Sequence, residues 1–237
     1  TESQWEYACR AGTTTAYSWG ATIASSNANY NWDGAHNTGN DFKQTRDVGQ
    51  YAANPWGFFD MHGNVWEWTA DWYQVAYPTG NPVVNPTGPA SGSYRVRRGG
   101  SWCNDGTTLR SARRSSSAPI YRTYSLGFRV GFQFTGTHSV DLNASVKLDM
   151  LWVEPGTFTM GSPTTEAGRG TNETEHNVTL TQGFYLGKYE VTQAQYQTVM
   201  NGNSEGLNAD PSQFKGSNRP VEKVSWEDAQ IFLSRLN

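Results

Sequence analysis

Oxygen-bearing groups gather in one short stretch of the sequence, DMHGNVWE, which begins at Asp60. The carboxylates of Asp60 and Glu67 stand at its two ends, and the backbone carbonyls of Gly63 and Val65 lie between them. Hard cations such as calcium take carboxylate, amide and backbone oxygens in loops. The stretch therefore predicts a calcium site, and the alternative is that Asp60 and Glu67 cap turns or pair with arginines.

The cysteines and histidines offer less chemistry. Cys9 and Cys103 are too few for a disulfide framework, and the sequence does not decide whether they form one bridge. We expect Cys9 to be a small core residue. No GxSxG or comparable nucleophile motif appears. Metal-ligand spacing is also missing from the four histidines, which are His36, His62, His138 and His176.

Arginines are concentrated between residues 95 and 129. They are Arg95, Arg97, Arg98, Arg110, Arg113, Arg114, Arg122 and Arg129. In a structural role, their guanidinium groups would bond loop carbonyls and carboxylates. The alternative is a site for an anionic ligand. The net charge of the chain, -3, argues against non-specific binding of nucleic acid.

Three short helices are predicted where capping residues precede apolar positions at helical spacing. They span residues 1–11, 193–200 and 226–236. The first two carry a capping box, because Gln4 and Gln195 each stand three residues after the N-cap. The N-caps are Thr1, Thr192 and Ser225. The apolar faces are Trp5, Ala8 and Cys9 in the first helix and Trp226, Ala229, Ile231, Phe232 and Leu236 in the third.

Strands are predicted over residues 94–100, 127–133, 150–160 and 177–190. Residues 13–58, in contrast, are rich in Asn, Gly, Thr and aromatics and show no sustained period. Such long irregular segments are uncommon in compact domains unless something, often a metal, organises them. With ten Trp, twelve Tyr, ten Phe and 25 Gly, the chain is expected to form a loop-rich fold held by large aromatic anchors.

The order of the segments carries the most information. Residues 97–132, which run from RRGGSW to GFRVGF, have the character of a closing segment, yet the opening segment MLWVEPGTFTMGS follows later, at 150–162. With GNVWEW at 63–68, these motifs resemble the formylglycine-generating enzyme (sulfatase-modifying factor) family with its halves exchanged. The resemblance covers nearly the whole chain. Further motifs that carry it are TESQWEYACRAG (1–12), GFYLGKYEVTQAQYQTVM (183–200) and RPVEKVSWEDAQIFLSRLN (219–237).

The resemblance implies an α+β fold, the family's variant of the C-type lectin fold, with short antiparallel sheets, a few helices and long loops. Residues 1–133 would then be the closing half, 134–149 a linker and 150–237 the opening half of one circularly permuted domain. The ends of the chain should lie near each other, and Trp66 and Trp68 should be core anchors. The alternative is two half-domains from a tandem array, which complete the fold within the chain or by exchange with a neighbour.

The resemblance also implies which chemistry to look for. Enzymes of this family oxidise a cysteine of a sulfatase peptide to formylglycine with oxygen and copper, and copper(I) suits a pair of thiolates. In those enzymes two cysteines follow the GGS-aromatic motif, and neither stands directly after the aromatic residue. Here Cys103 follows Trp102 at once, and no second cysteine follows in NDGTTLRSARR. The resemblance therefore implies a non-catalytic relative, with Cys103 a catalytic candidate only if the chain is an enzyme.

Calcium is the expected structural cofactor, and copper is expected only for an enzyme. The family's calcium site uses the positions of Asp60, Gly63, Val65 and Glu67, with Asn where this chain has Asp60. A second family site maps to the residues Asn29, Tyr30 (carbonyl), Asn40 or Asp41, and Phe42 (carbonyl).

Two functions of different classes follow. The first is a calcium-stabilised binding or structural module, because loops on a rigid frame are common recognition sites; its ligand would be an unknown protein or small molecule. The candidate surface comprises Trp102, Asn104, Asp105, Arg110, Arg113, Arg114, Tyr121, Arg122 and Tyr124. The alternative is a formylglycine-generating oxidase, or an oxygenase of the same fold with iron from another domain, acting on a protein cysteine. The linker also permits self-association by exchange of half-domains.

The sequence gives little about location. No apolar run approaches the roughly 20 residues of a membrane span. No signal peptide is recognisable and the first residue is Thr, so we expect a processed or excised chain whose targeting is not legible. An extracytoplasmic or secreted location is favoured.

Overall fold

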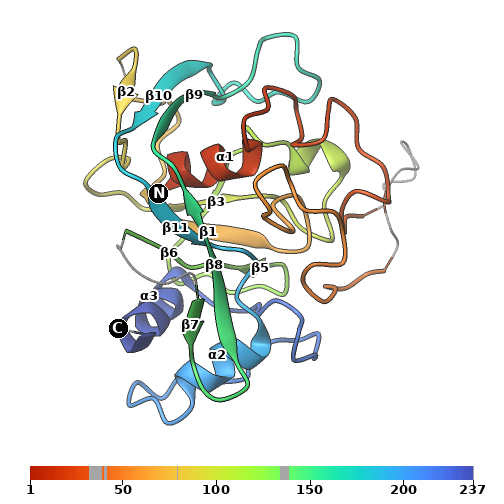
Figure 1. The fold of residues 1–237 in the computed structure, drawn as a ribbon, viewed down its shortest axis with the longest axis vertical. Helices are drawn as coiled ribbons and strands as arrows, with labels where there is room; N and C mark the ends of the chain where they lie inside the picture. The colour runs from red at the N-terminus through yellow and green to blue at the C-terminus, as the bar shows by residue number, and fades with distance from the viewer. Residues whose placement is uncertain (32–38, 40–41, 79, 134–138, 237) are drawn as a thin grey trace.

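The computed structural model describes residues 1–31, 39, 42–78, 80–133 and 139–236, in which short helices and strands alternate with long loops (Figure 1). All three predicted helices are present: α1 (Glu2–Arg10), α2 (Gln193–Met200) and α3 (Trp226–Leu236). No helix within the described ranges is long and apolar enough to cross a membrane.

The helices begin where their capping residues predict. Thr1 and Gln4 form a capping box at α1, and Thr192 and Gln195 form the same box at α2. Ser225 caps α3, because its hydroxyl accepts a hydrogen bond from the Asp228 N–H at 3.0 Å. Each cap satisfies an N–H group that the first helical turn leaves without a partner.

The C-terminal end of α1 depends on a residue far along the chain. Ala11 follows the helix in the left-handed conformation, with φ of 49°. The side-chain amide of Asn54 then donates to the carbonyls of Ala8 and Cys9, at 2.7 and 3.2 Å. Asn54 also accepts hydrogen bonds from the N–H groups of Trp56 and Phe58, so one side chain fixes part of the irregular segment 13–58 against α1.

The strands form three small sheets. The first has the order β4-β3-β1-β5, and its β1–β5 pair is parallel. Its members are β1 (Trp66–Trp72), β3 (Arg95–Arg98), β4 (Ser115–Ser117) and β5 (Leu126–Gly127). A 3-10 helix, Gly106–Leu109, lies between β3 and β4 in the chain.

Each of the other two sheets combines strands from before and after residues 134–138. One has the order β2-β10-β9, with members β2 (Val83–Val84), β9 (Gly156–Met160) and β10 (His176–Leu180). The other has the order β6-β11-β8-β7, with members β6 (Gly131–Phe132), β7 (Ser139–Asp141), β8 (Lys147–Val153) and β11 (Phe184–Gly187). Mixed α+β structure with small sheets and few helices is the predicted fold class.

Three predicted strands are each wrong in extent, because each is divided in two. The strand expected over 150–160 is interrupted at Glu154 and Pro155, so β8 and β9 lie in different sheets. The strand expected over 177–190 is interrupted near Gly183, where an added Cβ would lie 2.1 Å from the Trp152 ring. Likewise, the strand expected over 127–133 is divided between β5 and β6.

The predicted linker 134–149 also needs correction. Residues 139–141 form β7, which pairs antiparallel with β8 from Lys147 onward. Val140 and Leu142 pack against the main apolar core. Residues 139–149 are therefore part of the folded domain, and residues 134–138 lie outside the described ranges.

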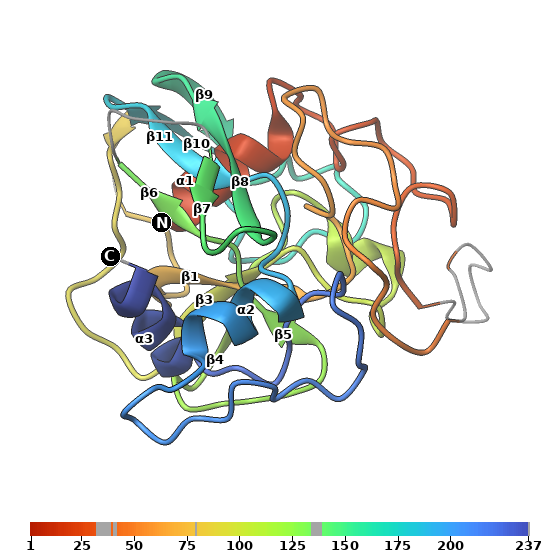
Figure 2. The same ribbon diagram turned by 60° about the horizontal axis from the view of Figure 1, so that its bottom comes forward.

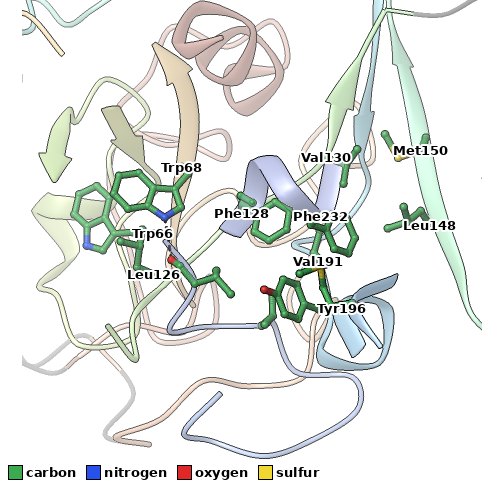
Figure 3. Close-up of a cluster of buried hydrophobic side chains, with 14 of the residues drawn as sticks. Trp66, Trp68, Leu126, Phe128, Val130, Leu148, Met150, Val191, Tyr196 and Phe232 are labelled. Carbon is green, nitrogen blue, oxygen red and sulfur yellow. Dashed lines mark hydrogen bonds between the residues drawn. The ribbon is translucent and has the colours of Figure 1, made fainter. Parts of the chain in front are cut away.

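The main apolar core joins the two parts of the chain (Figure 3). Trp66 and Trp68 are 4% and 6% exposed, as expected of core anchors, and pack in one cluster with Tyr196 and Phe232. The Phe232 ring is stacked on Tyr196 with centroids 5.6 Å apart. Burial of a side chain of this size contributes about 2–3 kcal/mol. The residues from after position 139 thus complete a core that begins with β1.

A second core lies under α1, which buries the predicted face of Trp5, Ala8 and Cys9. Met160 and Phe184, from the late part of the chain, pack in the same cluster. Two indole groups also form hydrogen bonds between the part of the chain before residue 134 and the part after residue 138. Trp68 donates to the Val224 carbonyl at 3.1 Å, and Trp226 donates to the Thr69 carbonyl at 3.0 Å.

A cavity of about 510 Å3 lies between α1, α3 and β1. Thr1 and Gln4 line it on one side, and Gln230 and Leu233 of α3 line it on another. Figures 1 and 2 both place the start of α1 and the end of α3 on the same side of the molecule. The predicted proximity of Asn237 to Thr1 involves a residue outside the described ranges.

Candidate functional site

Asp60 lies just after the irregular segment 13–58 and six residues before Trp66, the first residue of β1. Its backbone is in the left-handed region, with φ of 55°. Its carboxylate accepts a hydrogen bond from the Gly49 N–H at 2.7 Å, so the side chain caps a turn. Burial raises the pKa of Asp60 to about 6, with the Gly49 N–H and Arg129 opposing this rise.

Glu67 lies in β1, on the strand face opposite Trp66 and Trp68, and is completely buried. Arg129 holds it bidentately, with Nε and Nη2 each 2.7 Å from a carboxylate oxygen. The Trp5 indole donates to the same carboxylate at 2.7 Å. A charge buried this deeply needs such a partner, because an unpaired one costs several kcal/mol.

Glu190, which sequence reasoning did not select, brings a third carboxylate to the same place. It accepts hydrogen bonds from the Val65 N–H at 3.0 Å and from the Asn64 amide at 2.7 Å. Burial raises the pKa of Glu190, and the charges of Asp60 and Glu67 raise it further. No local signal links residue 190 to residue 65, since only the packing of β11 and its following loop brings them together.

This carboxylate cluster, defined as Asp60, Glu67 and Glu190, has one adjacent guanidinium, that of Arg129. Its oxygen chemistry fits a hard cation, and a bound cation would offset the burial that raises the pKa of Asp60 and Glu190. The hydrogen bonds, however, are those of a turn cap for Asp60 and an arginine pair for Glu67. Over the described residues, no three His, Cys, Asp or Glu side chains are grouped so that they could share a metal.

The second predicted metal set is only partly described. Asn40 and Asp41 lie outside the described residues. Asn29 is buried, and its amide donates to the Gln44 carbonyl and to the Asn64 side chain, at 3.0 and 3.2 Å. Tyr30 is buried, whereas Phe42 is 42% exposed.

The two thiols have different surroundings. Cys103 is partly exposed, and its Sγ lies 3.4 Å from the Ser101 hydroxyl. Cys9 is fully buried under α1, with its Sγ 3.5 Å from Nε2 of His62. Burial raises the pKa of the Cys9 thiol to about 12. Cys9 therefore has the expected role of a core residue, and neither sulfur forms a disulfide.

An aromatic surface lies beside Cys103. We define it as Trp102, Tyr121, Tyr124 and Phe214. Trp102 packs against Tyr124 and Phe214, with ring centroids 5.6 and 5.4 Å away, and its indole donates to the Tyr124 carbonyl. Tyr121 and Tyr124 are 47% and 42% exposed. Phe214 comes from the loop after α2 and was not predicted for this surface.

Asn104 and Asp105, which were predicted for the ligand surface, hold the neighbouring turn together. The Asn104 side chain accepts a hydrogen bond from the Ser101 hydroxyl at 2.7 Å. Asp105 caps the 3-10 helix, because its carboxylate accepts from the Thr108 N–H at 3.1 Å. Both residues remain partly exposed.

Two predicted surface arginines are instead buried, which corrects their assignment. Arg110 is 1% exposed and is held by Glu173, at 2.7 Å, and by Glu166. Arg114 is 5% exposed and pairs with Glu2 at 2.7 Å. Their charges are needed to neutralise buried carboxylates, so they are unavailable to a ligand.

The other two predicted arginines lie nearer the solvent but also have partners. Arg113 is 3.7 Å from Glu173. Arg122 is bonded bidentately to Asp228 at 2.6 and 2.7 Å, which ties the 118–124 loop to α3. The structural role proposed for the arginines thus applies to most of them.

Arg97 differs from these arginines. It lies in β3, partly exposed, and its Nε donates to the Ser115 hydroxyl at 3.2 Å. Its guanidinium is 4.8 Å from the centroid of the Trp66 ring. Burial lowers the pKa of Arg97, and Tyr121 and Cys103 are the ionisable side chains that act on it from nearby. No carboxylate of the described residues forms an ion pair with Arg97.

Comparison with known proteins places this arrangement in context. The profile of a family described as "Sulfatase-modifying factor enzyme 1-like domain" matches residues 1–133 and 139–237. A formylglycine-generating enzyme from Mus musculus is 38% identical over 139 residues, which cover 54% of this chain and 37% of that protein. One from Streptomyces coelicolor is 39% identical over 140 residues, covering 54% of this chain and 44% of that protein.

Among solved structures, Treponema denticola variable protein 1 is 36% identical, with a TM-score of 0.48 over 54% of this chain and 44% of that one. The chain therefore matches less than half of the length of each of these relatives.

Proposed function

Because the chain belongs to the sulfatase-modifying factor enzyme 1-like family, we propose that it is a non-catalytic member, a module that binds a protein or small-molecule ligand. The observation that carries the proposal is the isolation of the Cys103 thiol. Copper(I) chemistry on a peptide cysteine calls for two soft thiolates. Among the described residues, the Cys103 sulfur lies beside the Ser101 hydroxyl, and the other thiol, Cys9, is buried against His62.

An activity assay tests this proposal. The protein would be incubated with copper, a reductant and a peptide bearing the sulfatase cysteine motif, and the peptide mass would be followed. We expect no conversion to formylglycine. Conversion that is lost in Cys103→Ser but kept in the matched variant Cys9→Ser would overturn the proposal. The relatives named formylglycine-generating enzymes make the oxidase the second candidate.

The aromatic surface supports the binding role. Its four rings come from two distant parts of the chain, residues 102–124 and the loop containing Phe214. Large rings supply contact area at low entropic cost and are enriched in recognition sites. Arg122 and Asp228 fix the loop that carries Tyr121 and Tyr124, so part of the surface is organised before a ligand binds.

Calcium binding is the second part of the proposal. Asp60, Glu67 and the carbonyls of Gly63 and Val65 would hold the ion, and calcium there would offset the charge of the carboxylate cluster. Bound calcium supplies structural stability rather than reaction chemistry in this role. The excess of carboxylates over guanidinium groups supports it, with Glu190 as a further carboxylate whose pKa is raised by burial and would be lowered by a bound cation.

Thermal unfolding with and without calcium tests the proposed calcium site. A ligand present at 100 times its Kd stabilises the native state by about 2.7 kcal/mol. We expect calcium to raise the Tm of the wild-type protein, and Asp60→Ala to abolish most of that rise. Asp210→Ala, which removes an exposed carboxylate paired with Lys215, is the matched control. A Tm that calcium leaves unchanged, with no calcium found by elemental analysis, would contradict the site.

The third part of the proposal is that the family domain is circularly permuted in this chain. The family match, which covers residues 1–133 and 139–237, together with the shared cores, supports a domain completed within one chain. The cavity between α1 and α3 lies where the usual order of the family would connect these helices.

A further inference from the structure

The inference concerns the ligand of the aromatic surface and rests on the proposed binding function. We propose that this surface recognises a protein segment in which an aspartate or glutamate side chain is flanked by apolar residues, with Arg97 receiving the carboxylate. The Arg97 guanidinium lies near the Trp66 and Tyr121 rings and forms no ion pair among the described residues.

The first step is the charge of Arg97. Arg98, on the opposite face of β3, and Arg110 and Arg114 are each neutralised by glutamates within the chain. Arg97 forms one side-chain hydrogen bond, to the Ser115 hydroxyl, through Nε. That contact fixes the side chain and leaves its terminal nitrogens as donors. A guanidinium held in this way is suited to bind a carboxylate bidentately.

The positive charge available on this surface indicates how much negative charge the ligand carries. Arg122, in the loop that carries Tyr121 and Tyr124, already pairs with Asp228. Arg95, two residues along the same face of β3, forms no ion pair among the described residues either, but its guanidinium lies against the Trp72 and Trp226 rings and donates to the Ala70 carbonyl. Arg97 therefore contributes one positive charge beside Tyr121, which matches a single carboxylate. A phosphate carries more charge and is usually met by several cations. This favours an acidic side chain over a phosphorylated one.

The side chains beside Arg97 are largely aromatic or apolar. Tyr121 lies near Arg97, and Tyr124, Trp102 and Phe214 continue the surface as a set of mutually packed rings. Ile120, in the same loop, is 64% exposed. Apolar side chains next to the acidic residue would cover these groups and exclude water. Exclusion of water strengthens the bond between the carboxylate and Arg97.

An unbiased selection tests the inference. A random heptapeptide library on phage would be selected against wild-type protein, Arg97→Gln and Arg235→Gln. Arg235 is an exposed arginine bonded to the carbonyls of Val199 and Asn201, so its replacement makes the same change in charge elsewhere. We expect wild type and Arg235→Gln to enrich acidic residues beside apolar ones, and Arg97→Gln to lose the acidic bias.

Synthetic peptides make the test independent of any folding defect in the variant. An enriched peptide and its Glu→Gln version would be titrated against wild-type protein. We expect about tenfold or greater weakening for the Gln version, as for a lost charge-assisted hydrogen bond. We also expect weaker binding of the acidic peptide at high salt. Equal binding of the two peptides, or tighter binding of a phosphorylated one, would overturn the inference.

The selection also separates the two proposals. If wild type enriches peptides that lack acidic residues, and Tyr124→Ala abolishes their binding, the binding module stands and the role of Arg97 is wrong. If wild type enriches no peptide above an empty support, both the acidic specificity and peptide recognition by this surface are wrong.

Discussion

At the scale of single residues, this protein buries many charged side chains and pairs several of them with one another. Arg98 lies between Glu2 and Glu6, and Arg129 holds Glu67. Removal of one partner from such a pair costs about 3–5 kcal/mol, because the other charge is left buried. The fully buried Glu222 is different, since it is held by backbone N–H groups rather than by a guanidinium.

Glu222 should therefore make stability depend on pH. One of its oxygens accepts from the N–H groups of Gln213 and Phe214, at 2.6 and 2.8 Å, while the other has no partner. Burial raises its pKa from 4.5 to about 7, with those N–H groups and the charges of Lys223 and Lys215 opposing the rise. The folded state thus binds the proton more tightly than the unfolded state, and the cost of ionisation grows as pH rises from 4.5 through 7.

We expect Glu222→Gln to match wild type near pH 4.5 and to be about 2 kcal/mol more stable at pH 8, allowing for partial screening by solvent. Urea unfolding at both pH values measures the difference. Glu227→Gln, which removes an exposed carboxylate in α3, is the control. A difference between wild type and Glu222→Gln that is the same at both pH values would show that folding does not raise the pKa of Glu222.

At the scale of elements, the helices were predictable and the sheets were not. Thr1 with Gln4, and Thr192 with Gln195, are local signals that lie within four residues, and both capping boxes form. A strand in contrast needs a partner, and β2 finds its partner in β10, where Val83 pairs with Val178. No local pattern could supply that pairing.

The candidate site follows the same rule. The stretch DMHGNVWE was identifiable because its oxygens are close in sequence. Glu190, Arg129 and Phe214 were not identifiable as members of these sites, because packing alone brings them to residues 65, 67 and 102. The arginines were misassigned where their carboxylate partners, such as Glu173 for Arg110, come from distant segments.

The seam between β5 and the segment before α3 yields a prediction at this scale. An added Cβ on Gly127 would lie 2.4 Å from the Val221 carbonyl oxygen, which is backbone and cannot rotate away. We expect Gly127→Ala to destabilise the protein by about 2–3 kcal/mol, measured by urea unfolding. Gly131→Ala is the control, since there the closest atom to the Cβ is the end of the Leu186 side chain at 3.1 Å, and the Tyr185 carbonyl oxygen is at an ordinary contact distance of 3.7 Å. An equal, small effect of both substitutions would mean that the backbones of Gly127 and Val221 can move apart at little cost in free energy.

At the scale of the whole molecule, the parts before and after residues 134–138 share their apolar cores and their ion pairs. Each part alone would expose the faces that the other covers. At about 25 cal/mol per Å2 of apolar surface, such exposure would remove most of the few kcal/mol that stabilise a domain. We therefore expect one cooperative unfolding transition for the intact chain.

A protease site inserted between Gln133 and Ser139 tests this expectation. After cleavage, the two fragments should co-migrate as one particle in sedimentation and should separate only in denaturant. Neither purified fragment should regain a folded circular dichroism spectrum alone, whereas the mixture should. Fragments that part after cleavage, each with its own cooperative transition, would show two independent domains. A dimer of the uncleaved chain would instead support exchange of halves between chains.

The distance along the chain between bonded partners has a consequence for the rate of folding. Glu2 pairs with Arg114 across 112 residues, and Trp226 bonds to Thr69 across 157. Chains dominated by such remote contacts fold slowly, because long loops must close before any contact stabilises them. During synthesis, at about 5–20 residues per second, the tryptophans of β1 would emerge several seconds before α3 exists to cover them. The nascent chain should therefore depend on chaperones for that interval.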